Sequence, residues 1–122
     1  MAAFADDADV IAGPELGAVA LAAATAMACG KPFAIVRKVR KEYATGKLIE
    51  GTDVREKRVL LVEDVGTTAG AALEAASTLT DAGATITRLV FAIDRMEGAR
   101  ENVQAAGHEF QAILNTEDLR IK

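Results

Sequence analysis

The chain has 122 residues, a formal net charge of −4 and an apolar content of 51%. This is the length of about one domain, and the apolar content excludes a disordered chain. No uninterrupted apolar run reaches the roughly 18–20 residues of a membrane helix, and the acidic first nine residues are not typical of a signal peptide. The single cysteine (Cys29) and the single histidine (His108) exclude an internal disulfide and a Cys/His zinc site, so a cytoplasmic location is expected. The acidic total disfavours broad binding to nucleic acid.

Short apolar runs alternate with amphipathic or Ala-rich stretches along the whole chain. In chain order we expect a strand at 9–12, a helix at 15–29, a strand at 33–37, a polar loop at 38–51 with a short extended piece at 47–50, a strand at 58–62, a helix at 68–82, a strand at 85–93, a helix at 97–106 and a strand at 109–114. This alternation predicts an α/β fold: a mainly parallel, twisted sheet with helices on both faces. Ligands bind at the carboxyl ends of such strands, which selects the turns after Ala12, Val62 and Ile93.

The turn after Val62 reads E-D-V-G-T-T-A-G-A-A and opens a helix. The amides at the start of that helix favour a phosphate dianion, and the small side chains let a ligand approach the backbone. The adjacent carboxylates of Glu63 and Asp64 suit the vicinal hydroxyls of a ribose or a metal-bound diol. The residues alone are equally compatible with an ordinary strand–helix turn capped by Thr. A Walker loop is excluded because no Gly-Lys-Ser/Thr follows.

The same residues resemble the phosphoribosyl-pyrophosphate (PRPP) motif of type I phosphoribosyltransferases, which have a Rossmann-like core. The resemblance implies that Glu63 and Asp64 bind the ribose hydroxyls. It assigns the 5′-phosphate to Thr67, Thr68, Ala69, Gly70 and Ala71. Three residues depart from the family pattern: Gly66 replaces a usually bulky residue, Ala69 stands where Gly is common, and Ala71 stands where Ser or Thr often donates a hydroxyl. These departures weaken side-chain contacts to phosphate and leave the backbone donors intact.

A cluster of positive charge follows the strand at 33–37 in an otherwise acidic chain. Five cations fall within eleven residues: Arg37, Lys38, Arg40, Lys41 and Lys47. A run of this kind is often no more than a solvated loop. Its glycines and its position directly after a strand also fit a loop that closes over a polyanion and shields it from water.

The pattern R-K-x-x-K-E-Y-x-x-G-K-L-I-E-G is more specific and resembles the catalytic loop of orotate phosphoribosyltransferases. The resemblance implies a flexible catalytic loop at 38–51 in which Arg37, Lys38 and Lys41 neutralise the pyrophosphate. Tyr43 takes a position where some members of the family have His. The family's loop reaches across a dimer interface, so Lys38 would serve its own subunit, and Lys41 and Tyr43 the partner's.

The turn after Ala12 reads G-P-E-L-G-A. From the residues alone, its amides could hold a second phosphate, or it is a plain turn with Pro near the first helical position. By the same family resemblance it is the pyrophosphate loop, which consists of Gly13, Pro14, Glu15, Leu16 and Gly17.

The turn after Ile93 reads D-R-M-E-G-A, and a lone Arg in such a place is more often a surface ion-pair partner than a ligand. In the orotate branch, an Asp-Arg-x-Glu-Gly stretch occupies this turn. The resemblance therefore implies that Arg95 binds the orotate carboxylate in a bidentate way and that Thr67 also contacts orotate. A bidentate guanidinium–carboxylate pair suits that task.

The four motifs occur in the family's order over roughly residues 9–119. They imply a single phosphoribosyltransferase core domain at 1–122. It would transfer phosphoribosyl from PRPP to orotate in pyrimidine biosynthesis, as a cytoplasmic homodimer, with Mg²⁺ held mainly by PRPP and water. The alternatives are a purine or other base-salvage enzyme, a PRPP- or nucleotide-sensing module, and an inactive truncated core. Orotate phosphoribosyltransferases usually carry a hood segment before the first core strand, and we expect it to be missing because only residues 1–8 precede that strand.

Overall fold

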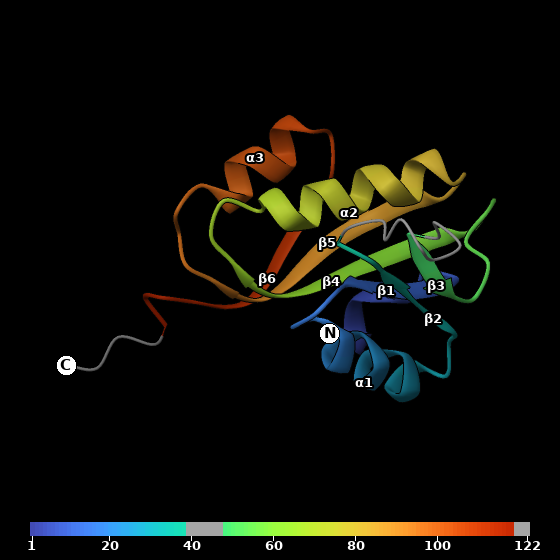
Figure 1. Cartoon of the computed structure of the whole chain (residues 1–122). Coiled ribbons are helices and arrows are strands. Elements are labelled where there is room, and N and C mark those ends of the chain that lie inside the picture. Colours follow the sequence, from blue (N-terminus) through green and yellow to red (C-terminus); the bar gives the residue numbers. More distant parts are fainter. Residues whose placement is uncertain (39–47, 119–122) are drawn as a thin grey trace.

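A six-stranded sheet with strand order β3-β2-β1-β4-β5-β6 runs through the centre of the molecule (Figure 1). The computed structural model describes residues 1–38 and 48–118. The strands are β1 (Val10–Pro14), β2 (Phe33–Val36), β3 (Ile49–Gly51), β4 (Arg58–Gly66), β5 (Thr85–Asp94) and β6 (Phe110–Asn115). All neighbours pair in parallel except β2 and β3, which are antiparallel. The mainly parallel sheet predicted from the sequence is confirmed.

Helices cover both faces of the sheet, as predicted (Figure 1). Helix α1 (Val19–Cys29) and the short 3₁₀ turn η1 (Ala2–Phe4) lie on one face, and α2 (Gly70–Asp81) and α3 (Ala99–Ala105) lie on the other. Successive strand residues point to opposite faces, so Leu60 packs with the α1 layer and Leu61 with the α2 layer. Strand β4 is therefore buried on both sides. No helix in the described part of the chain is long and apolar enough to cross a membrane.

Most predicted boundaries differ from the structure by one or two residues, but two beside the candidate site were wrong by four. Helix α1 begins at Val19 and not at residue 15, because the backbone amide of Glu15 still donates to the Val36 carbonyl (2.9 Å) and so extends the sheet pairing beyond Pro14. Strand β4 continues past Val62 to Gly66, which pairs with Asp94. The acidic residues at 63–64 suggested that the strand ends there. The backbone of β4 nevertheless continues to pair with β5, because strand pairing does not depend on side-chain polarity.

Glycine allows close packing at two positions near the carboxyl ends of the strands. A Cβ atom on Gly13 would lie 3.0 Å from the Ala22 Cβ, so glycine lets α1 approach β1 closely. A Cβ atom on Gly66 would lie 2.8 Å from the Phe91 ring. The small residue at 66, unusual for the motif, is thus explained by the buried phenylalanine on β5.

We predict that Gly66→Ala lowers the free energy of unfolding by about 1–3 kcal/mol, because the new methyl group overlaps the Phe91 ring in a packed core. Urea denaturation measures the change. Gly70→Ala is the control, since Gly70 opens α2 and its added Cβ meets nothing closer than 3.7 Å. A stability loss as large at Gly70 as at Gly66 would contradict the packing explanation.

Candidate functional site

Three turns meet at the carboxyl edge of the sheet, since they follow the adjacent parallel strands β1, β4 and β5. The first turn touches β4 directly: a Cβ on Gly17 would lie 2.5 Å from Asp64 Oδ2. The third turn is joined to the end of β4 by a hydrogen bond from the Arg95 amide to the Gly66 carbonyl (2.9 Å). The motifs that are far apart in sequence are therefore neighbours in space.

Two half-buried carboxylates, Glu63 and Asp64, lie on β4 at the centre of this edge. The Asp64 amide donates to Glu63 Oε1 (3.1 Å), and the Val65 amide donates to Asp64 Oδ1 (2.8 Å). Burial and then the hydrogen-bonded Asp64 carboxylate raise the pKa of Glu63 to about 7, although its backbone contact to Asp64 and the positive charge of Lys38 act in the opposite direction. Near neutral pH, Glu63 can accept or donate a hydrogen bond.

The turn between β4 and α2 presents Thr67 and Thr68 to solvent and buries Ala69. Ala69 is the N-cap of α2, and no side chain caps this end of the helix. The Thr cap expected of an ordinary strand–helix turn is therefore not formed, and Gly70 and Ala71 open the helix on an exposed surface. Such an end attracts anions because its amides and the helix dipole are both oriented toward it.

Ala69 has a left-handed backbone, with φ of 69°. This conformation costs a residue with a Cβ roughly 1–2 kcal/mol. The family's glycine avoids that cost, which explains why Gly is common at this position. The alanine side chain packs in the core between the sheet and helices α2 and α3, and this burial offsets part of the strain.

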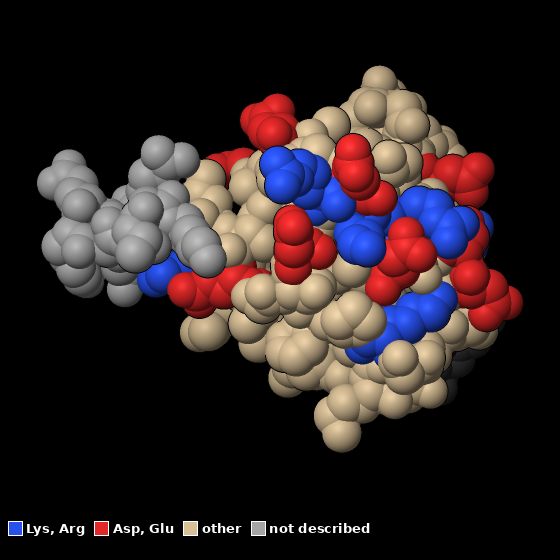
Figure 2. Space-filling model, turned by 90° about the vertical axis from the view of Figure 1, so that its right-hand side faces the viewer, with Lys and Arg blue, Asp and Glu red and all other residues tan. Residues whose placement is uncertain are grey.

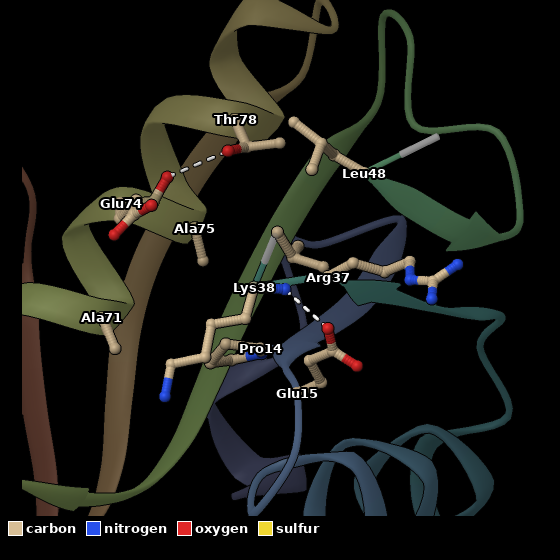
Figure 3. Close-up of a pocket in the computed structure, with 10 residues that line it drawn as sticks. Pro14, Glu15, Arg37, Lys38, Leu48, Ala71, Glu74, Ala75 and Thr78 are labelled. Atoms are coloured by element: carbon tan, nitrogen blue, oxygen red, sulfur yellow. Dashed lines mark hydrogen bonds between the residues drawn. The ribbon is translucent and has the colours of Figure 1, made fainter. Parts of the chain in front are cut away.

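The turn after β1 is joined to the first residues of the basic segment, which is the stretch at 37–51. The Lys38 amide donates to Glu15 Oε1 (2.7 Å), and both residues line a pocket of about 60 Å³ between β2 and α2 (Figure 3). The Lys38 side chain extends toward Ala71 at the start of α2 (Figure 3). The guanidinium of Arg37 points the other way and pairs with Glu50 on β3 (3.3 Å), so of these two cations it is Lys38 that directs its charge toward the start of α2.

The turn after β5 is held rigidly by its own backbone. The carboxylate of Asp94 is buried and accepts the Met96 amide (2.9 Å), and Met96 and Gly98 both have positive φ. This geometry leaves Arg95 half exposed, with its Nε 3.0 Å from Glu97 Oε2. In this structure, Arg95 is thus paired with a carboxylate of its own turn.

Three contacts at the site carry no signal in the sequence. They are the bond from Lys38 to the Glu15 carboxylate, the buried Asp94 carboxylate beneath the Arg95 turn, and a bond from Asn102 Nδ2 to the Thr68 carbonyl (2.8 Å). The predicted Arg40, Lys41, Tyr43 and Lys47 lie outside the described residues. Within the described residues, no group of three or more His, Cys, Asp or Glu side chains could hold a metal ion.

An ion pair between Asp9 and Arg58 fastens the opposite edge of the sheet. Asp9, before β1, accepts two hydrogen bonds from the Arg58 guanidinium and one from its amide, and these bonds hold the pKa of Asp9 at about 2. On the face seen in Figure 2, cationic and anionic residues are interspersed. Among the described residues of that face, the positive charges are therefore separated by negative ones.

Comparison with known proteins places the whole arrangement in one family. Residues 1–111 match the family model described as the phosphoribosyl transferase domain. The chain belongs to this family. Its resemblance to the orotate branch is confirmed by an orotate phosphoribosyltransferase of Halobacterium salinarum, which is 46% identical over 121 residues covering 97% of this chain and 69% of the relative.

Other relatives are longer than this chain. The orotate phosphoribosyltransferase of Methanopyrus kandleri is 46% identical over 114 residues, which are 93% of this chain and 62% of the relative. A Mycobacterium tuberculosis orotate phosphoribosyltransferase in complex with PRPP superposes with a TM-score of 0.84 at 36% identity, covering 96% of this chain and 68% of that one. The chain thus spans about three fifths of the length of curated relatives such as the M. kandleri protein.

We predict that Glu63→Gln raises the melting temperature more at pH 8 than at pH 5. With a folded-state pKa of about 7 against an ordinary 4.5, native Glu63 binds its proton more tightly than the unfolded chain does. Its contribution to stability is therefore fully present below pH 4.5 and is lost as the pH rises through 7. The neutral glutamine avoids this loss.

Thermal unfolding of both proteins across pH 5–8 measures the difference. Glu74→Gln, the same exchange at an exposed position on α2, is the control. A difference between wild type and Glu63→Gln that stays constant with pH would rule out the buried, protonated Glu63.

Proposed function

We propose that this chain catalyses the transfer of phosphoribosyl from PRPP to orotate, which gives orotidine 5′-monophosphate and pyrophosphate in pyrimidine biosynthesis. The observation that carries the proposal is the meeting of the Glu63–Asp64 pair, the uncapped start of α2 and the Lys38 side chain at one sheet edge. The names of the relatives and the PRPP complex of the M. tuberculosis neighbour support this substrate assignment.

The ribose and its 5′-phosphate would bind across β4 and the start of α2. Glu63 and Asp64 would bind the two ribose hydroxyls, and the amides and hydroxyls of the turn would bind the phosphate. The residues of this turn are Thr67, Thr68, Ala69, Gly70 and Ala71. The half-protonated state of Glu63 near pH 7 suits a diol, since a hydroxyl both donates and accepts.

The pyrophosphate would lie between the turn after β1 and the basic segment. When orotate nitrogen attacks C1, the C1–oxygen bond to pyrophosphate breaks, the ribose gains positive charge and the leaving group gains negative charge. Lys38 and Lys41 would neutralise the leaving group, with Tyr43 beside them. Arg37 would join them by exchanging its ion pair with Glu50 for the pyrophosphate. The amides of the turn at 13–17 would add neutral donors.

We also propose Mg²⁺ as the cofactor. Magnesium is commonly held by one or two carboxylates together with substrate phosphates and water, which fits a site with the acid pair Glu63 and Asp64 at its centre. When bound with PRPP, the cation would supply positive charge to the pyrophosphate oxygens. The protein's own task is to hold the ribose and the leaving group on either side of C1.

The base would be oriented by Arg95 and Thr67. The Arg95 guanidinium already binds a carboxylate in this structure, that of Glu97. An orotate carboxylate would take the place of Glu97 and gain two hydrogen bonds from the same planar group. Purine bases and uracil carry no carboxylate, so this contact would select orotate.

We further propose a single core domain at 1–122, a homodimer in which the segment at 38–51 reaches the neighbouring site, and a cytoplasmic location. The surface of α1 supports the dimer. Its sequence is apolar on all sides, and Met27 and the adjoining Leu16 are each 83% exposed. Large apolar side chains at such exposure are typical of a surface that another protein covers.

The proposed reaction is tested by measuring pyrophosphate release from PRPP and Mg²⁺ with orotate, hypoxanthine, adenine or uracil as the acceptor. Of the four acceptors, we expect that orotate alone supports pyrophosphate release. Release with a purine would assign the chain to base salvage. PRPP binding in a calorimeter without release from any base would indicate a sensing module.

We predict that Arg95→Ala raises the KM for orotate by about tenfold or more and leaves the KM for PRPP within about twofold. The expected size follows from the loss of a charged hydrogen-bonded pair, about 1.5–3 kcal/mol. Steady-state kinetics measure both constants. Arg100→Ala, which removes an exposed guanidinium stacked 4.6 Å from Phe110, is the control and should change neither KM. An equal rise in both constants would count against orotate recognition by Arg95.

We predict that Lys41→Ala lowers turnover by about 100-fold or more with no change in thermal unfolding. Removal of one preorganised charge at a developing anion typically costs about 3–4 kcal/mol of transition-state stabilisation. Lys57→Ala, at an exposed position before β4, is the control. Unchanged turnover in an otherwise active protein would remove Lys41 from the mechanism.

A further inference from the structure

The carbonyl before the strained alanine of the phosphate turn is held from a distant helix. Asn102 on α3 donates from Nδ2 to the Thr68 carbonyl at 2.8 Å, across 34 residues of sequence. Asn102 is exposed, so this bond is not a by-product of core packing. It is a long-range side-chain contact from α3 to the turn at 67–69.

The position of this carbonyl decides where the next amide points. In a planar trans peptide the C=O and N–H groups point in opposite directions. Because the Thr68 oxygen is turned toward α3, the Ala69 N–H is directed away from α3. Beyond Ala69, the turn is fixed by the first helical bond of α2, from the Leu73 amide to the Ala69 carbonyl (2.8 Å). Asn102 therefore holds the peptide before Ala69, and helix α2 holds the peptide after it.

The substitution of alanine for the usual glycine makes such a contact necessary. Ala69 has a φ of 69°, which a residue with a Cβ adopts only when its surroundings enforce it. On one side, its buried methyl group packs in the core beneath α2 and α3. On the other side, the preceding peptide is held by Asn102.

We propose that Asn102 is a positioning residue for the 5′-phosphate turn: it holds the Thr68–Ala69 peptide so that the amides of the turn face a sugar phosphate. This inference rests on the proposed function, which places the phosphate at this turn. Asn102 also lies one helical turn after Gly98, whose carbonyl accepts the Asn102 amide (3.0 Å). Through its backbone amide and its side chain, Asn102 thus links the turn that carries Arg95 to the turn at 67–69.

The experiment measures calorimetric binding of two probes, ribose 5-phosphate and pyrophosphate, to the wild type, Asn102→Ala and Asn102→Leu. Both variants lose the donor, and leucine keeps the bulk. We expect each to bind ribose 5-phosphate about fivefold to tenfold more weakly, as for the loss of one hydrogen bond that orders a site. Pyrophosphate, which would bind at the turn after β1, should be unaffected. Gln104→Ala, at an exposed position of the same helix, should change neither affinity.

Unaltered ribose 5-phosphate binding in both variants, beside a wild type that binds it, would overturn the assignment of Asn102. Equal weakening of both probes would do the same, since it would report a general structural loss. A wild type that binds neither probe would overturn the proposed function itself. The outcomes are therefore distinguishable.

A second measurement tests the link to Ala69. Glycine adopts the left-handed conformation without strain. In the Ala69→Gly background, Asn102→Ala should therefore weaken ribose 5-phosphate binding by less than about twofold. A loss as large as in the Ala69 background would show that Asn102 does not act through the strained turn.

Discussion

The register between β4 and β5 is the constraint on which the site depends. Their backbones pair without interruption from Leu60 to Glu63 and again at Val65 and Gly66, so that Gly66 lies beside Asp94. The two turns that follow therefore leave the sheet at the same level, and the Arg95 amide bonds to the Gly66 carbonyl. A slip of one residue would move every side chain of β4 to the opposite face and would break the bond between the Arg95 amide and the Gly66 carbonyl. The buried residues of both faces hold this register.

Several carboxylates near the proposed polyanion site of this acidic protein have a partner. Glu15 accepts the Lys38 amide, Glu97 pairs with Arg95, and Asp94 accepts a backbone amide beneath the turn. Glu63 is kept partly protonated by burial and by Asp64. These carboxylates are thereby protonated, paired with a cation or hydrogen-bonded to an amide, which weakens their repulsion of a phosphate. The Lys38 side chain and the uncapped start of α2 face the pocket.

The layout of the fold and the three turns could be predicted because alternation of apolar runs fixes which strands are parallel, and parallel strands place their carboxyl ends together. The start of α1 and the end of β4 could not, since both are set by sheet hydrogen bonds at Glu15 and Gly66 that side-chain polarity does not reveal. The bonds of Asn102 and Glu15 span 34 and 23 residues, so they exist only once the elements have packed. The strained backbone of Ala69 is likewise a property of the folded turn, although the absence of the family's glycine pointed to that residue.

The antiparallel pair of β2 and β3 fixes both ends of the basic segment. The Arg37 amide bonds to the Leu48 carbonyl (2.6 Å), and the Arg37 and Glu50 side chains close an ion pair across the same strands. The pairing therefore sets the distance between Arg37 and Leu48, whatever the number of residues between them. Doubling a loop closed in this way costs only about 0.6 kcal/mol. Insertions or deletions between residues 39 and 47 are thus expected to leave the register of β2 and β3 and the position of Lys38 unchanged.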